Sequence, residues 1–191
     1  MKFTPRVVVV VGSPGSGKDI LIRAVKDLGV GHARIVPKHT SRQQRPDDGN
    51  EMICPESHDF ALDQCDIVYV NYDDRYGIIS AHIWQGLKEG VFQVIVVSNV
   101  AAINQLKAVF SGFLLLVYVH SEMTSEQYLQ SEATSEHDEY AMRRSQQLWE
   151  TFEMYMNNFL SFDHVLIHGG TPEDLYDQIF RLFRAYERGL I

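Results

Sequence analysis

The sequence is poor in cysteine, with only Cys54 and Cys65 among its 191 residues. The two cysteines form no close metal-binding or redox motif, and the histidines share no spacing typical of metal ligands. These absences argue against a structural zinc site and against a disulfide framework. We therefore expect two free thiols in a cytoplasmic protein.

Long apolar runs and positive charge are also scarce. The runs at residues 7–11 and 113–119 are much shorter than the roughly 20 residues of a membrane-spanning helix, and neither resembles a signal peptide. With 17 Lys and Arg against 25 Asp and Glu, the formal net charge is −8. A broad basic face is not expected, so neither nucleic acid nor a membrane is predicted as a partner.

Internal repeats, low-complexity stretches and linkers are absent as well. A chain of 191 residues that is 45% hydrophobic is long enough to bury a sizeable core. We therefore predict that residues 1–191 form a single domain. The sequence leaves the oligomeric state open, with a homodimer as one candidate.

The sequence does contain a phosphate-binding loop. Residues 7–19 are VVVVVGSPGSGKD, in which an apolar run typical of a buried parallel strand ends at a glycine. The residues that follow match the spacing G-x-x-x-x-G-K. Glycines let successive N–H groups point at one anion, and the start of a helix adds its dipole. ATP phosphates are expected at Gly12, Ser13, Gly15, Ser16, Gly17, Lys18 and Asp19, with Lys18 also catalytic.

Asp19 departs from this motif, which has Ser or Thr after the lysine to bring a hydroxyl to magnesium. A carboxylate can hold Mg²⁺ directly or through water, because magnesium prefers oxygen ligands. Without the metal, the same carboxylate repels phosphate groups. We therefore predict Mg²⁺ at Asp19 and nucleotide binding that depends strongly on the metal.

Apolar strands alternate with helical patterns along the rest of the chain. This order predicts a three-layer α/β fold with a mostly parallel sheet and with ligands at the carboxyl ends of its strands. In a helix predicted at 136–160, Trp149, Phe152, Met156 and Phe159 recur at helical spacing and indicate a packing stripe. Further strands are predicted at 34–36, 66–70, 91–97, 113–119 and 162–167, and further helices at 18–28, 55–62, 78–89, 101–110 and from 171 onward.

A polar segment at residues 37–50 carries Lys38, Arg42 and Arg45 directly after the second predicted strand. Guanidinium groups match phosphate oxygens in geometry. An ordinary solvated loop is the alternative, but the position of the segment in a phosphate-loop domain favours a second anion site.

In the order and spacing of these pieces, the chain resembles the guanylate kinase family of nucleoside monophosphate kinases. The resemblance implies a P-loop kinase fold with an acceptor-binding insertion near residues 37–80 and a short lid near 121–140. It rests on GSPGSGKD, on TSRQQR at 40–45, on Tyr76-Gly77, on Met142-Arg143-Arg144 and on FDHVLI at 162–167.

The family also implies roles for individual residues. The acceptor phosphate would be held by Arg42, Arg45 and Tyr76, and the transferring phosphate would be contacted by Arg143 or Arg144. ATP and Mg²⁺ are the implied phosphate donor and cofactor.

Three departures from the family concern the acceptor. Residues 68–70 include no guanine-reading glutamate, Ser98-Asn99 stand where an aspartate is expected, and Ile78 replaces a hydroxyl residue. The related ribose 1,5-bisphosphate phosphokinases resemble the chain in having an aspartate after the loop lysine and a Gly-x-Glu, here at residues 49–51. A sugar phosphate is therefore an alternative to a GMP-like nucleotide.

The predicted lid is acidic, with no Lys or Arg from residue 108 to residue 142. Family members close arginines over ATP there, and one such arginine is worth roughly 10³–10⁵ in rate.

The phosphate loop and the family resemblance together predict ATP- and Mg²⁺-dependent phosphoryl transfer to a small phosphorylated acceptor. A diverged, non-catalytic nucleotide-binding module is the competing hypothesis.

Four other polar residues are secondary candidates. His39 is either an acceptor contact or a solvated loop histidine, and His168 is a candidate base contact. Asp48 and Glu51 are candidate contacts for an acceptor hydroxyl or base.

Overall fold

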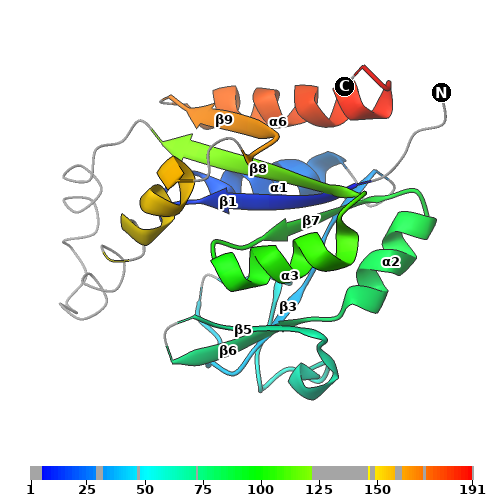
Figure 1. The fold of residues 1–191 in the computed structure, drawn as a ribbon, viewed down its shortest axis with the longest axis vertical. Coiled ribbons are helices and arrows are strands. Elements are labelled where there is room, and N and C mark those ends of the chain that lie inside the picture. The colour runs from blue at the N-terminus through cyan, green and yellow to red at the C-terminus, as the bar shows by residue number, and fades with distance from the viewer. Residues whose placement is uncertain are drawn as a thin grey trace.

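A computed structural model of the chain describes residues 6–28, 32–46, 48–71, 73–121, 146, 149–157, 161–169 and 171–190. Its central sheet has the strand order β2-β7-β1-β8-β9, and every pairing in it is parallel. Figure 1 shows strands of this sheet side by side, with α3 in front of them and α1 behind. Its strands are β1 (Val7–Gly12), β2 (Ala33–Ile35), β7 (Phe92–Val96), β8 (Leu114–Ser121) and β9 (His164–His168).

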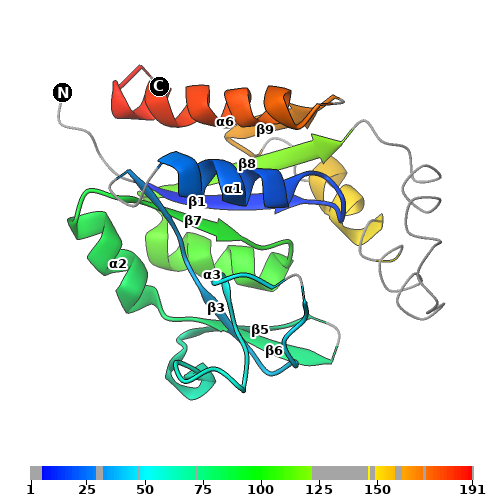
Figure 2. The same ribbon diagram turned by 180° about the vertical axis from the view of Figure 1, so that it is seen from behind.

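Helices cover both faces of the central sheet, as Figures 1 and 2 show from opposite sides. Helices α1 and α6 pack on one face, whereas α2, α3 and the helical residues 149–157 lie on the other. The α/β fold with a mostly parallel sheet is thus confirmed. The helix bounds are α1 (Lys18–Leu28), α2 (Ser80–Lys88), α3 (Val100–Phe110) and α6 (Pro172–Glu187).

A second, four-stranded sheet lies beside the central one, in the order β4-β3-β6-β5. Its strands β5 and β6 form an antiparallel hairpin, and β6 also pairs antiparallel with β3. This sheet contains much of the predicted acceptor-binding part of the chain. Its strands are β3 (Lys38–Thr40), β4 (Met52–Ile53), β5 (Ile67–Asn71) and β6 (Asp74–Ile78).

Local signals account for the start of α6. The Thr171 side chain accepts a hydrogen bond from the Asp174 N–H at 3.3 Å, and Pro172 occupies the first turn. Helix α2 has no such local cap. Instead, the distant Asp66 carboxylate accepts hydrogen bonds from the Ser80 N–H, at 2.8 Å, and from the Ser80 hydroxyl. A tertiary contact therefore fixes where α2 begins.

Two secondary-structure predictions are wrong. Residues 55–62 form consecutive turns followed by a short 3₁₀ helix at Leu62–Gln64, rather than an α-helix. The segment at 37–50 is not a continuous loop, because it contains β3. Hydrogen bonding of His39 and Thr40 to β6 across the sheet produces this strand, and the polar composition of the segment gives no sign of it.

The predicted packing stripe on the helix near 149–157 is also wrong. Trp149 is 60% exposed and Met156 53% exposed. The helix instead buries Thr151 and Met154 and stacks Tyr155 on Tyr118 of β8, with ring centroids 4.0 Å apart. An aromatic partner on the sheet decides the orientation of the helix, whereas spacing alone indicates only a face. Phe159 and the predicted lid after residue 121 lie outside the described residues.

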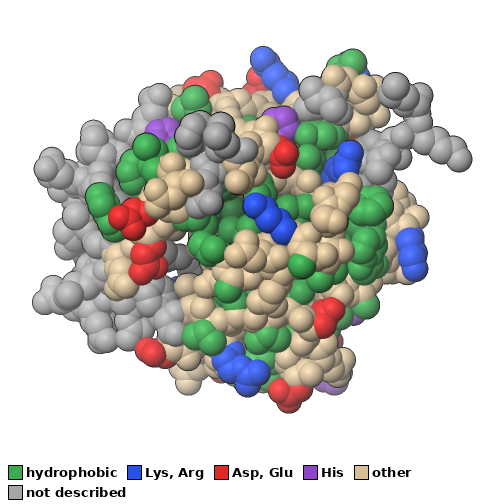
Figure 3. All heavy atoms as spheres, viewed as in Figure 1, with side chains coloured by type: hydrophobic (Ala, Val, Ile, Leu, Met, Phe, Trp, Pro, Cys, Tyr) green, Lys and Arg blue, Asp and Glu red, His purple; other side chains and the backbone are tan. Residues whose placement is uncertain are grey.

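Surface features of the described residues bear on nucleic acid and membranes, which the sequence does not predict as partners. On the face shown in Figure 3, lysine and arginine side chains lie singly rather than in a continuous patch. In the part of the chain that the structure describes, no helix is both long enough and apolar enough to cross a membrane. Both cysteines are free thiols.

We predict that Gly86→Ala destabilises the fold. A Cβ at residue 86 would lie 2.1 Å from Nε2 of the buried Gln93 side chain, so either that side chain would lose its hydrogen bond to the Val91 carbonyl or α2 would have to move away from β7. Overpacking of this kind costs about 2 kcal/mol in the free energy of unfolding, which exceeds the gain of about 1 kcal/mol from alanine's helix propensity. Urea denaturation measures the change. Gly112→Ala is the control, because its Cβ would meet nothing within 4 Å; equal stability of the two variants would contradict the prediction.

Candidate functional site

The phosphate loop lies at the carboxyl end of the central sheet, between the last residue of β1 and the first residue of α1. Two of its glycines are required by geometry. A Cβ on Gly12 would lie 2.5 Å from the Ser16 hydroxyl oxygen, and Gly17 has a φ of 93° with Leu175 closely packed against it. The loop therefore keeps its backbone tightly curled, as an anion-binding loop must.

Lys18 folds back over the loop. Its ammonium donates to the carbonyl oxygen of Gly12 at 2.7 Å and to that of Ser13, and it lies 3.5 Å from the Ser16 hydroxyl. These contacts hold a cation at the mouth of the loop, where an anion would replace the carbonyl oxygens as its partner. This arrangement suits the predicted role of Lys18.

Ser98 ties the loop to the neighbouring strand. The Ser98 hydroxyl donates to the Gly12 carbonyl at 3.0 Å. The Ser98 hydroxyl oxygen also accepts the Gly12 N–H, at 3.4 Å. Residue 98 follows β7, where the family resemblance leads one to expect an aspartate. Sequence reasoning recorded only the missing carboxylate and missed this contact, because the contact joins residues 86 positions apart.

Asp19 lies in the first turn of α1, on its exposed side. Its side chain is 78% exposed and lies 3.6 Å from the Arg23 guanidinium, one turn further along the helix. Its carboxylate oxygens are thus accessible to a cation from solvent, and an exposed pair of this kind is weak enough for a metal ion to displace Arg23. These residues fit a Mg²⁺ ligand at this position.

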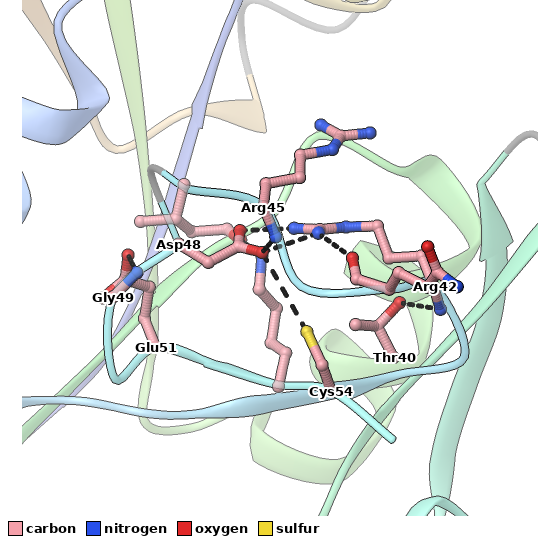
Figure 4. Close-up of polar contacts among 10 residues, drawn as sticks. Thr40, Arg42, Arg45, Asp48, Gly49, Glu51 and Cys54 are labelled. Atoms are coloured by element: carbon pink, nitrogen blue, oxygen red, sulfur yellow. Dashed lines mark hydrogen bonds and ion pairs between the residues drawn. The ribbon is translucent and has the colours of Figure 1, made fainter. Parts of the chain in front are cut away.

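The loop between β3 and β4 contains a largely buried ion pair between Arg42 and Asp48 (Figure 4). Two guanidinium nitrogens of Arg42 donate to the two Asp48 carboxylate oxygens at 2.5 and 2.6 Å. The two side chains are only 10% and 8% exposed. Asp48 also accepts a hydrogen bond from the Arg45 N–H at 2.7 Å, so a single carboxylate holds the loop from residue 42 to residue 48 in shape.

The charges of this pair stabilise each other. Hydrogen bonds to Asp48 raise the pKa of the Arg42 guanidinium, and the Tyr76 hydroxyl acts in the same direction. Burial by itself would raise the pKa of the Asp48 carboxyl, but hydrogen bonds from Arg42 and from the Arg45 backbone outweigh it and lower that pKa. Asp48 is therefore ionised, and its contact is with Arg42 rather than with solvent.

The three predicted acceptor-binding residues come from adjacent segments. Tyr76, on β6, reaches the Arg42 guanidinium and stacks on Tyr69, with ring centroids 5.3 Å apart. The side chain of Arg45 extends away from the Arg42–Asp48 pair, as Figure 4 shows. The fold thus brings Arg42 and Tyr76 into contact, with the Arg45 backbone on the same carboxylate.

Other predicted site residues are placed differently. His39 is buried rather than in contact with solvent, and its Nδ1 accepts the Ala61 N–H at 3.1 Å. Burial lowers the pKa of the His39 imidazole. Glu51 accepts the Gly49 N–H at 3.1 Å and lies 3.5 Å from the Lys26 ammonium. His168, at the end of β9, packs beside Gly17 of the phosphate loop.

Arg143 and Arg144, the two predicted catalytic arginines, lie outside the described residues. Within the described part of the chain, no group of three or more His, Cys, Asp or Glu side chains is arranged to hold a metal ion. A Mg²⁺ ion would therefore need oxygen atoms of the nucleotide and water in addition to Asp19.

The comparisons with known proteins identify the fold. No protein-family model matches the chain, and no curated protein matches its sequence. Among solved structures, the guanylate kinase from Anaplasma phagocytophilum is similar, with a TM-score of 0.66 at 14% sequence identity. The alignment covers 98% of this chain and 88% of that one. The chain therefore has a guanylate kinase-like fold.

We predict that Asp48→Asn lowers the free energy of unfolding at pH 7 by about 2 kcal/mol, because Arg42 loses charged hydrogen bonds. Since the pKa of Asp48 is lowered by folding, the stabilisation is present above the ordinary pKa of 3.8 and is lost as the pH falls through the folded-state pKa. Urea unfolding of wild type and variant at several pH values measures this. A difference that stays constant below pH 3.8 would be inconsistent with it.

Proposed function

We propose that the protein transfers the γ-phosphoryl group of ATP to a small phosphorylated acceptor, a GMP-like nucleoside monophosphate. The observation that carries the proposal is the presence, in one guanylate kinase-like fold, of a phosphate loop and of two arginines, Arg42 and Arg45, in a loop that Asp48 holds in shape. Two candidate anion sites in one kinase-like fold suit a reaction between two phosphates.

In this reaction an oxygen of the acceptor phosphate bonds to the γ-phosphorus of ATP. The bond from that phosphorus to the bridging oxygen breaks, and ADP leaves with the electron pair. The loop N–H groups and Lys18 bind the ATP phosphates, with the Lys18 ammonium exchanging its carbonyl partners for phosphate oxygens. Catalysis of this kind consists largely of positioning and charge stabilisation.

The acceptor phosphate binds Arg42, Arg45 and Tyr76. Asp48 occupies one edge of the Arg42 guanidinium and so orients the edge that remains. Arg45 brings a more exposed charge to the acceptor. Arg143 or Arg144 contacts the transferring phosphate, and closure of the lid at 121–140 excludes water.

Asp19 is the residue that would hold Mg²⁺, because its carboxylate is accessible at the start of α1. When bound, Mg²⁺ supplies positive charge that stabilises the phosphate oxygens of ATP. The reaction is assigned to the cytoplasm.

A phosphorylated sugar such as ribose 1,5-bisphosphate is a second candidate acceptor. The strand β5 carries no carboxylate that would read a guanine edge, and Val70 is exposed there instead. A non-catalytic nucleotide-binding module is the third candidate. It is favoured by the internal neutralisation of the site, in which Asp19 pairs with Arg23 and Asp48 with Arg42.

One prediction of this proposal concerns turnover. ADP release from ATP and Mg²⁺ is expected to depend on an acceptor when the protein is tested with GMP, dGMP, AMP, CMP, UMP and ribose 1,5-bisphosphate. Lys18→Ala is expected to abolish turnover, and Arg42→Ala is expected chiefly to raise the acceptor KM. No release with any acceptor, from protein that binds ATP, would leave the binding module as the function.

Another prediction of this proposal concerns the metal. Nucleotide affinity measured by calorimetry is expected to fall sharply when Mg²⁺ is removed, because the Asp19 carboxylate then faces the phosphates alone. Asp19→Ser should bind metal-free ATP about tenfold more tightly, a difference of about 1.4 kcal/mol. Asp27→Ser, an acid further along α1, is the matched control. Equal ATP affinity of wild-type protein with and without Mg²⁺ would refute the metal assignment.

A further inference from the structure

Lys38 lies where the two sheets meet. It belongs to β3, and its ammonium donates to the carbonyl oxygen of Val96 at 2.6 Å, across to the last residue of β7. Val96 pairs in register with Val10, two residues before the phosphate-loop residue Gly12. The ammonium is therefore held beside the carboxyl end of the central sheet, where ligands bind in parallel α/β folds.

The charged groups that face Lys38 come from the acceptor side. They are Glu51 and Asp48, which attract the ammonium, and Arg42, which repels it; Lys26 of α1 in turn pairs with Glu51. Burial lowers the pKa of Lys38 to about 8, and Glu51 opposes that shift. The ammonium thus remains largely charged at neutral pH, next to the Arg42–Asp48 pair.

The hydrogen bonding of this ammonium is incomplete. An ammonium has three N–H donors, and within the described part of the chain Lys38 makes one hydrogen bond, to Val96. The Lys38 residue is partly buried, so these donors are neither fully solvated nor paired within the described residues. The two remaining donors are suited to the oxygen atoms of an anion.

Holding the second sheet in place does not by itself require a charge. Neutral amides hold it elsewhere, since Gln105 of α3 exchanges two hydrogen bonds with the Val68 backbone of β5, at 2.8 and 3.1 Å. Asn99 likewise donates to the Val70 carbonyl at 3.1 Å. Partial burial of the Lys38 charge costs more than burial of a neutral amide, so a role in holding an anion accounts for a lysine here better than a role in packing.

We propose that Lys38 is a further phosphate-binding residue, whose ammonium contacts the acceptor phosphate on the side that faces the phosphate loop. The inference rests on the proposed function and extends its acceptor site by one cation. Lys38 forms no covalent bond and keeps its protons, while the acceptor oxygen bonds to the γ-phosphorus and ADP leaves. It supplies, from the sheet itself, positive charge that the acidic lid lacks.

The test follows the Lys38 side chain directly. In wild-type protein labelled with ¹³C at the lysine ε-carbons, the Lys38 signal is assigned by its loss in Lys38→Arg. With MgADP filling the phosphate loop, addition of GMP, ribose 1,5-bisphosphate or inorganic phosphate should raise the pKa of Lys38 toward the ordinary lysine value, because a bound anion favours the charged form. The Lys26 signal is the internal control and should not move.

Kinetics give the second readout. Lys38→Met is expected to lower kcat/KM for the acceptor by about 100-fold, while the affinity for ATP and the kinetics of Lys26→Met stay close to wild type. A Lys38 pKa that none of the three probes changes would overturn the proposal, even if the enzyme turns over. A changed pKa without turnover would instead support the Lys38 site and refute the proposed transfer.

Discussion

The burial of β1 on both faces is the constraint on which the rest of the structure depends. Alternate valines of this strand enter opposite layers, with Val8 and Val10 against α1 and α6 and the remaining three against α2 and α3. The strand also pairs in parallel register with both β7 and β8, from Val7 to Val10 on one side and from Val7 to Gly12 on the other. The end of β1 at Gly12 therefore fixes the phosphate loop, and Ser98 secures that end to β7.

Charges around the candidate site are largely paired within the chain. Arg42 pairs with Asp48 in a buried bidentate contact, Lys26 lies near Glu51, and Lys18 rests on backbone carbonyl oxygens. Such pairing keeps cations in fixed positions and limits their repulsion before a ligand arrives. An incoming anion would bind the N–H donors of these cations that the internal contacts do not use. The arrangement is consistent with the net charge of −8, since a few placed donors suffice to bind phosphate.

Polar side chains that bind backbone groups join the second sheet to α3 and to the central sheet. Gln105 holds the edge strand β5 by both its N–H and its C=O, Asn99 both caps α3 and reaches β5, and Lys38 bonds to the end of β7. These contacts satisfy strand edges that would otherwise expose unpaired backbone groups.

The sequence by itself determined the phosphate loop, the alternation of strands and helices, and the α/β fold, because each of these follows from local spacing and burial. The acceptor roles of Arg42, Arg45 and Tyr76 come from the family resemblance and stay predictions. Only the tertiary structure decided that Asp48 binds Arg42, that His39 is buried, that Asp66 caps α2 and that Trp149 is exposed. Each of these outcomes depends on which distant group a side chain meets in space. Periodicity along the chain indicates a face or a turn, but it does not identify the partner, since that contact forms only once both sheets are in place.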